Sequence, residues 1–410
     1  MKSFLLTLLM LFLVNAPVLP GQSIQVSLDD VEQFAEKHSP EWEQFNHRLE
    51  FMVQGENADA VRLNPELHYD LEYLNSDPRS EREHFAFIEQ ELRTPSHFRN
   101  LRQYRDQRVE AINKEIKSSK SKWLADMRFG FIRIVLIKEQ LSGLEQLQRL
   151  PDHFMEALEL RSQEGETSLI EEQLLKMSRY QLQSLIRELE LSLEQQKSEW
   201  LIRMGIDNDQ HVEFVGSFSD PEITIPGKEE LMVLLDQAPE RQATDLARQS
   251  ARQSIDLEES RRWPSFSVRA GYKTLNPDFH GFMAGVSIPI PLLNRNRPAI
   301  EQARAQERMS ALTYSATVDR QNRQLNQAWD ALYSIRSGLN ELPEETAGTD
   351  NFINTLTVAY EEGEQSLNDV LNTLNMMADT HRTKFSQLEQ AYEQVMIIEA
   401  VTGRSVLMAY

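Results

Sequence analysis

Two hydrophobic patterns alternate along the chain. Long segments repeat apolar residues every three or four positions, which indicates amphipathic helices, and the longest of them runs from about residue 96 to 150, or as far as Gly165 if it continues through Pro151. Shorter segments alternate apolar and polar residues strictly, which is typical of strands with two different faces. The apolar positions of the two clearest strands are Leu67, Tyr69, Leu71 and Tyr73 in one and Phe266, Val268, Ala270 and Tyr272 in the other. Polar residues such as Arg269 fall on the opposite face. The strand at 85–92 alternates less clearly, and its faces are not assigned from the sequence.

The pattern occurs twice. Residues 164–205 open on Glu-Gly-Glu and end on Gly205, and residues 362–403 do the same and end on Gly403. Both ends of the second copy stand 198 residues after the first (363 − 165 and 403 − 205). A constant offset over a long segment indicates duplication, with each unit reading helix, strand, turn, strand, long helix, break, long helix.

The following boundaries are expected. A first repeat spans 24–205, with strands at about 65–93 and a helical hairpin at about 96–204; a connector spans 206–227; and a second repeat spans 228–410, with strands at about 264–292 and a helical hairpin at about 297–402. Residues 1–23 have the features of an export signal, because Lys2 precedes an eleven-residue apolar core at 4–14 that is too short to span a bilayer. We expect cleavage near Ser23.

Composition excludes several functions. A net charge of −21 and a pI near 5.0 argue against a nucleic-acid partner. The absence of cysteine excludes disulfides, thiolate metal sites and a cysteine nucleophile. The nine histidines show no ligand spacing, and the chain has neither a phosphate-binding glycine loop nor a Gly-x-Ser-x-Gly elbow. We therefore expect no enzyme, no cofactor and no bound metal.

The strands leave two architectures open. Four strands cannot close a barrel, and an open sheet edge cannot face lipid, so several chains must share one barrel if the strands enter a membrane. Alternatively, both strand pairs pack on the helices of a soluble protein.

The residues resemble the TolC-type outer membrane efflux proteins over nearly the whole chain after residue 23. The resemblance is strongest at 264–305 and at 360–371, and the run Ile-Pro-Ile-Pro-Leu-Leu-Asn-Arg-Asn-Arg at 288–297 is most similar to the heavy-metal cation-efflux branch. The resemblance implies a mainly α protein with a membrane β-barrel portion. Each protomer would supply four strands to a trimeric twelve-stranded barrel in the outer membrane, continued by a coiled-coil helical tube in the periplasm.

The implied function is a passive exit duct of a tripartite efflux pump that exports small molecules or metal cations. Its implied partners are two further copies of the chain, a periplasmic adaptor protein, an inner-membrane transporter of the resistance-nodulation-division type and outer membrane lipid, with no nucleic acid. Two alternatives stay open: a type I secretion exit duct, and a structural periplasmic coiled-coil protein.

The resemblance also assigns roles near the two glycine turns. A gate would consist of Glu171, Asp369, Tyr360, Gln365 and Asn372, and adaptor-docking tips would consist of Gly165, Glu166, Thr167, Gly363, Glu364 and Gln365. Glu171 and Asp369 each stand six residues after a turn glycine. Gln365 replaces an arginine that can pair with the acid, and Asn372 stands where a second acid can occur. The implied closure is therefore hydrogen-bonded more than ionic. Solvated acids at a helix end are the alternative.

Overall fold

The computed structural model describes residues 24–76, 79–163, 169–207, 210–220, 222–275, 279–292, 294–342, 355–360, 362 and 364–407. The export signal expected at 1–23 lies outside these residues.

The two halves of the chain have the same order of elements. The first half contains β1 (Ile24–Val26), α2 (Val31–His38), α3 (Pro40–Asp59), β2 (Glu66–Ser76), β3 (Arg79–Leu92), α4 (Pro95–Gln163) and α5 (Leu169–Met204). The second half contains β4 (Val212–Phe214), α6 (Lys228–Asp236), α7 (Pro239–Ser260), β5 (Phe266–Leu275), β6 (Phe279–Ser287), α8 (Arg297–Asn340) and α10 (Leu367–Thr402). The expected strand and helix segments are present, while the repeat boundaries stay a prediction.

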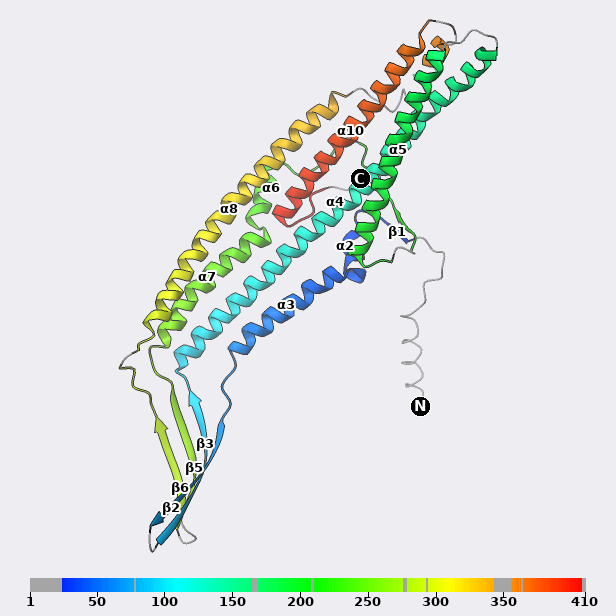
Figure 1. The fold of residues 1–410 in the computed structure, drawn as a ribbon. Coiled ribbons are helices and arrows are strands. Elements are labelled where there is room, and N and C mark those ends of the chain that lie inside the picture. Colours follow the sequence, from blue (N-terminus) through cyan, green and yellow to red (C-terminus); the bar gives the residue numbers. More distant parts are fainter. Residues whose placement is uncertain are drawn as a thin grey trace, which may run out of the picture.

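The molecule is long, with the sheet of β2, β3, β5 and β6 at one end (Figure 1). The helices α3, α4, α7 and α8 run side by side away from the sheet, and α5 and α10 extend to the opposite end. In sequence, α4 and α7 belong to different halves, yet they pack against each other along the body. The two halves are therefore interleaved, and they do not form two separate domains.

The helix α4 is 69 residues long and continues through Pro151. At 1.5 Å per residue, a helix of this size is about 100 Å long. Its buried side chains contribute to two clusters in succession. The first, in the middle of the body, joins α4 to the small elements and to α8 and α10; the second joins the distal part of α4 to α5 and α10. Both clusters contain residues from the two halves of the chain.

The two repeat-end glycines are in equivalent surroundings. Gly205 and Gly403 end α5 and α10 with φ of 72° and 70°, a left-handed conformation that glycine adopts without strain. A Cβ on Gly205 would lie 2.6 Å from Pro40 Cδ, and one on Gly403 would lie 2.4 Å from Pro239 Cδ. Each glycine thus lets the end of a long helix meet the first turn of the second helix in its own half, α3 for Gly205 and α7 for Gly403.

A small parallel pair, β1 with β4, was not expected. Ile24 pairs with Val212 and Val26 with Phe214, so the start of the first half is joined to the start of the second. The sequence predicts only a connector at 206–227. A strand of three residues is too short to show a period of two. In the structure Val26 and Phe214 are buried, and Phe214 packs on Phe131 and Trp200.

Candidate functional site: the sheet and the helical tips

The four-stranded sheet has two chemically different faces. Its strands run in the order β2-β3-β5-β6, every neighbouring pair antiparallel. In this register Tyr69, Ala86, Tyr272 and Phe282 form one row across the sheet. Directly opposed residues project from the same side, so the alternation predicted for single strands becomes one mainly apolar face, which the row of Leu71, His84, Thr274 and His280 interrupts with polar groups. The exposed large apolar residues on this face are Leu67, Tyr69, Leu71, Tyr73, Ile88, Leu92, Val268, Tyr272, Phe282 and Val286.

The register also assigns β3, whose faces the sequence left open. Ala86 and Ile88 lie on the apolar face, and Phe85 and Phe87 lie on the opposite face. Alternation was hard to recognise in this strand because large apolar residues occur on both sides. The faces of β3 follow from its pairing with β2 and β5, and this register cannot be read from a single sequence.

The opposite face is polar, and its aromatic rings are covered by charged groups. Lys273 Nζ lies 4.4 Å from the centre of the Phe85 ring, and the Arg269 guanidinium lies 5.9 Å from that of Phe87. His68 stacks on Phe87 from the other side, with ring centres 4.7 Å apart. Lys273 also pairs with Glu83 at 2.8 Å. The predicted placement of Val268 and Arg269 on opposite faces is therefore present in the structure.

The helical tips lie at the end farthest from the sheet (Figure 1). The tip residues Gly165, Glu166, Thr167 and Gly363 lie outside the described residues. Near the second tip the backbone N–H groups of Glu364 and Gln365 both donate to the Ala359 carbonyl, at 2.8 and 3.1 Å. These two bonds hold the chain close to the last described turn of helix before α10. The side chains of Glu364 and Gln365 are exposed.

Tyr360 is a core residue of the tip. It is only 7% exposed, and its ring meets Phe154 edge to face, with centres 5.0 Å apart and planes at 85°. Phe154 comes from α4, so the contact joins the two halves near their tips. This packing gives Tyr360 a structural role, and the gating role stays a prediction.

Asp369 forms a capping box at the start of α10. Its backbone N–H donates to Ser366 Oγ at 3.3 Å, and its carboxylate accepts from the Ser366 hydroxyl at 2.6 Å and from the Ser366 N–H at 3.3 Å. This arrangement satisfies helix N–H groups that would otherwise lack partners. The Ser-x-x-Asp spacing could have predicted it, so an acid that the family resemblance assigns to a gate also stabilises its own helix.

The other gate residues lie in the first turns of the tip helices. Glu171 is half-buried in the first turn of α5, and Asn372 is exposed one turn after Asp369. The starts of α5 and α10 share one buried cluster, in which Leu175 of α5 is found with Val370 and Leu371 of α10. The structure therefore brings the two acidic helix ends into one region.

The described residues hold no group of three or more His, Asp or Glu that could bind a metal ion. Within the same residues, no helix combines the length and apolarity that crossing a membrane requires.

No protein-family model matches the chain. The cobalt-zinc-cadmium resistance protein CzcC of Cupriavidus metallidurans is 28% identical over 158 residues, which make up 37% of this chain and 36% of CzcC. The chain thus matches little more than a third of this relative.

Solved structures resemble the chain over almost all of its length. CusC has a TM-score of 0.75 at 15% identity and covers 96% of each chain. The outer membrane protein VceC of Vibrio cholerae has a TM-score of 0.73 at 13% identity, covering 92% of this chain and 96% of its own. The outer membrane channel CmeC of Campylobacter jejuni has a TM-score of 0.75 at 12% identity, covering 93% and 86%. The chain therefore has the fold of bacterial outer membrane channels, and the TolC-type fold class expected from the sequence is confirmed.

Proposed function

We propose that the chain is one protomer of a trimeric, passive exit duct in the outer membrane, which continues as a helical tube in the periplasm and serves a tripartite efflux pump. The observation that carries this proposal is the sheet at one end of the molecule, which has an exposed apolar face, a polar face and two open edges. A duct of this kind moves its cargo without chemical change, so we propose no enzymatic activity.

The open edges require partner strands. Among the described strands, β2 and β6 each pair on one side only. Unpaired backbone groups are costly in lipid, so the edges must be closed by neighbouring copies. Three copies of four strands give twelve, which is enough to close a barrel, with the apolar face outward and the Arg269 face inward.

The helices also lack partners on one side. On α5 the exposed apolar residues Ile170, Met177 and Leu191 recur at intervals of seven and fourteen positions. On α8, Met309 and Leu312 are exposed as well. Heptad spacing is typical of a helix that packs on another helix, and the described part of the chain leaves these apolar residues exposed. Packing between copies would build the wall of the periplasmic tube.

The similarity to CzcC supports metal cations as cargo, together with the heavy-metal branch of the family resemblance. From the family resemblance we also propose two partners: a periplasmic adaptor at the tips and an inner-membrane transporter of the resistance-nodulation-division type. A photo-crosslinker that replaces Gln365 should capture the adaptor in cells. Capture only from positions on the sheet would contradict docking at the tips.

The sheet assignment can be tested with a single charge. Val268→Arg puts a cation on the apolar face and should destabilise the inserted protein by about 2–4 kcal/mol if this position is near the bilayer midplane. We expect fewer trimers in the outer membrane fraction and fewer conductance events in planar bilayers. Val233→Arg, on an exposed valine of α6, is the matched control and should leave both unchanged. Normal insertion of Val268→Arg together with defective Arg269→Val would reverse the two faces. A wild-type protein that neither enters the outer membrane fraction nor conducts would contradict the proposed function.

A further inference from the structure

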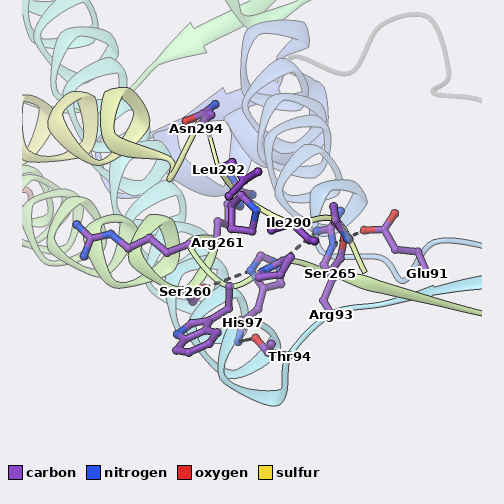
Figure 2. Close-up of a pocket in the computed structure, with 15 residues that line it drawn as sticks. Glu91, Arg93, Thr94, His97, Ser260, Arg261, Ser265, Ile290, Leu292 and Asn294 are labelled. Atoms are coloured by element: carbon purple, nitrogen blue, oxygen red, sulfur yellow. Dashed lines mark hydrogen bonds and ion pairs between the residues drawn. The ribbon is translucent and has the colours of Figure 1, made fainter. Parts of the chain in front are cut away.

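A cavity of about 720 Å³ lies where the strands meet the helices. It is formed by three connections: the end of β3 with the start of α4, the segment between α7 and β5, and the segment after β6 (Figure 2). Its position places it at the base of the sheet, where the proposed function would locate the periplasmic surface of the outer membrane.

One part of the cavity wall is apolar and exposed. Trp263, Ile290 and Leu292 are 73%, 76% and 79% exposed. Ile290 and Leu292 lie in the segment that follows β6, the strand that contributes Phe282 and Val286 to the apolar face of the sheet. Tryptophan is enriched at membrane interfaces because its ring is apolar and its N–H is polar.

The other part of the wall is cationic. Three arginines line the cavity, Arg93, Arg261 and Arg262, and Glu91 is its one acidic lining residue. Arg93 lies 3.7 Å from Glu91, and Arg261 pairs with Glu258 at 2.6 Å. The Arg262 side chain has no ion pair or hydrogen bond with any described residue. A local excess of positive charge is notable in a chain with a net charge of −21.

Neighbouring groups hold the cationic wall in place. Arg93 Nη1 donates to His97 Nε2 at 3.2 Å, so the imidazole proton lies on Nδ1 and donates to Ser260 Oγ at 3.3 Å. Asn296 fixes the segment after β6, since its amide nitrogen donates to the Glu258 carbonyl and carboxylate, both at 2.8 Å. The Glu258 carboxylate therefore binds Arg261 and Asn296 and does not pair with Arg262. The Arg262 guanidinium is thus available to a ligand.

We propose that this cavity binds the phosphate of an anionic phospholipid, with Arg262 as the principal contact and an acyl chain along Ile290 and Leu292. The inference rests on the proposed function, which puts the apolar face of the sheet in lipid. Guanidinium groups bind phosphate oxygens with two parallel hydrogen bonds, and the lipid tail accounts for the exposed apolar wall. A soluble phosphate would leave that wall in water.

Native mass spectrometry of the purified trimer can test lipid binding directly. The protein would be mixed with phosphatidylglycerol, with phosphatidylcholine of the same acyl chains, and with glycerol 3-phosphate. Phosphatidylglycerol should be retained in preference to phosphatidylcholine, because the zwitterionic headgroup has no net charge. Glycerol 3-phosphate should be retained weakly, because it has the phosphate without the tails.

The variant Arg262→Gln should bind phosphatidylglycerol about tenfold more weakly, as expected for the loss of a charge-assisted hydrogen bond. Arg262→Lys should retain part of the affinity, because it keeps the charge and loses the paired geometry. Arg323→Gln is the matched control, since it removes one exposed positive charge from α8 far from the cavity, and its binding should equal that of the unaltered protein.

Equal retention of the two lipids by the unaltered protein would overturn the proposal. The same result is expected if a neighbouring protomer covers the cavity in the trimer, so that outcome also counts against it. Retention of glycerol 3-phosphate as tight as that of the lipid would also overturn it, in favour of a soluble anion. The comparison of the two lipids decides the question even if Arg262→Gln yields no trimer. Conductance measured on the same preparations separates the two hypotheses: channels without lipid selectivity would refute this inference alone, and the absence of channels would refute the proposed duct.

Discussion

Glu399 and Arg128 form a buried ion pair that anchors the C-terminal segment. Arg128 Nε lies 3.1 Å from Glu399 Oε2, with side chains 8% and 4% exposed. The other Glu399 oxygen accepts from the backbone N–H groups of Val406 and Leu407, at 2.8 and 3.1 Å. Arg128 also donates to the Leu28 carbonyl at 3.3 Å. One carboxylate therefore joins α10, α4 and the segment after α10. No sequence motif marks this pair, because its members are 271 positions apart.

Glu399→Ala should lower the free energy of unfolding by about 3–5 kcal/mol, because Arg128 would stay buried without its partner. Urea unfolding of the purified protein measures the loss. Glu393→Ala, an exposed acid on the same helix, is the control and should have little effect. The double variant Arg128→Met with Glu399→Leu should lose less than Glu399→Ala alone. A larger loss of unfolding free energy in the double variant would show that the ion pair itself contributes more to stability than the cost of leaving Arg128 buried without a partner.

His97 should make stability depend on pH. Burial, followed by the positive charges of Arg93 and Arg261, lowers the pKa of His97 below its ordinary value of 6.5. The unfolded chain keeps the ordinary pKa, so below pH 6.5 it binds more protons than the folded protein, and folding becomes less favourable as the pH falls. His97→Gln should reduce the drop in melting temperature between pH 7.5 and 5.5. His211→Gln, at an exposed histidine, should leave the drop unchanged. An equal drop in all three proteins would exclude this role for His97.

Within the strand elements, a glycine lets β5 approach the backbone of β3 closely. A Cβ on Gly271 would lie 2.3 Å from the Ala86 carbonyl oxygen and 2.4 Å from Phe87 Cβ, whereas one on Gly281 would have no neighbour within 4 Å. Gly271→Ala must therefore push β3 and β5 apart and should cost about 1–3 kcal/mol. Gly281→Ala should be neutral. The yield of folded protein and its urea midpoint measure both, and equal values for the two variants would contradict the close approach of Phe87.

Elements with strong periods could be predicted from the sequence, and elements that depend on a partner could not. The alternation at 266–272 predicts both faces of β5, and Gly205 and Gly403 predict where α5 and α10 end. The faces of β3 could not be predicted because Phe85 and Phe87 require Lys273, Arg269 and His68 to cover them. The capping function of Asp369 is local and was open to prediction, whereas the burial of Tyr360 depends on Phe154, about two hundred residues away.

At the scale of the whole molecule, the internal repeat predicts pseudo-symmetric surroundings, and the structure provides them at Pro40 and Pro239. It does not predict how the halves interleave, because a period of three to four residues shows that α4 and α7 each have an apolar face and does not show which helix covers it. The same duplication places an acidic residue in the first turn of both tip helices. Threefold repetition of the chain would multiply these two acids to six.

The last prediction concerns these six carboxylates. Two unit charges about 6 Å apart repel by roughly 0.7 kcal/mol in bulk-like dielectric, and more where water is restricted, so a ring of acids should attract divalent cations. If Glu171 and Asp369 line a constriction, the double variant Glu171→Ala with Asp369→Ala should weaken the block of single-channel current by divalent cations added from the periplasmic side.

Asp369 also caps α10, and the loss of a cap costs about 1 kcal/mol by itself. Ser366→Ala is the control because it removes the capping hydroxyl and keeps the carboxylate. Its block should match that of the unaltered channel. Unchanged block and conductance in the double variant would rule out a gating role for the two acids, and weakened block in Ser366→Ala would attribute the effect to the capped helix end.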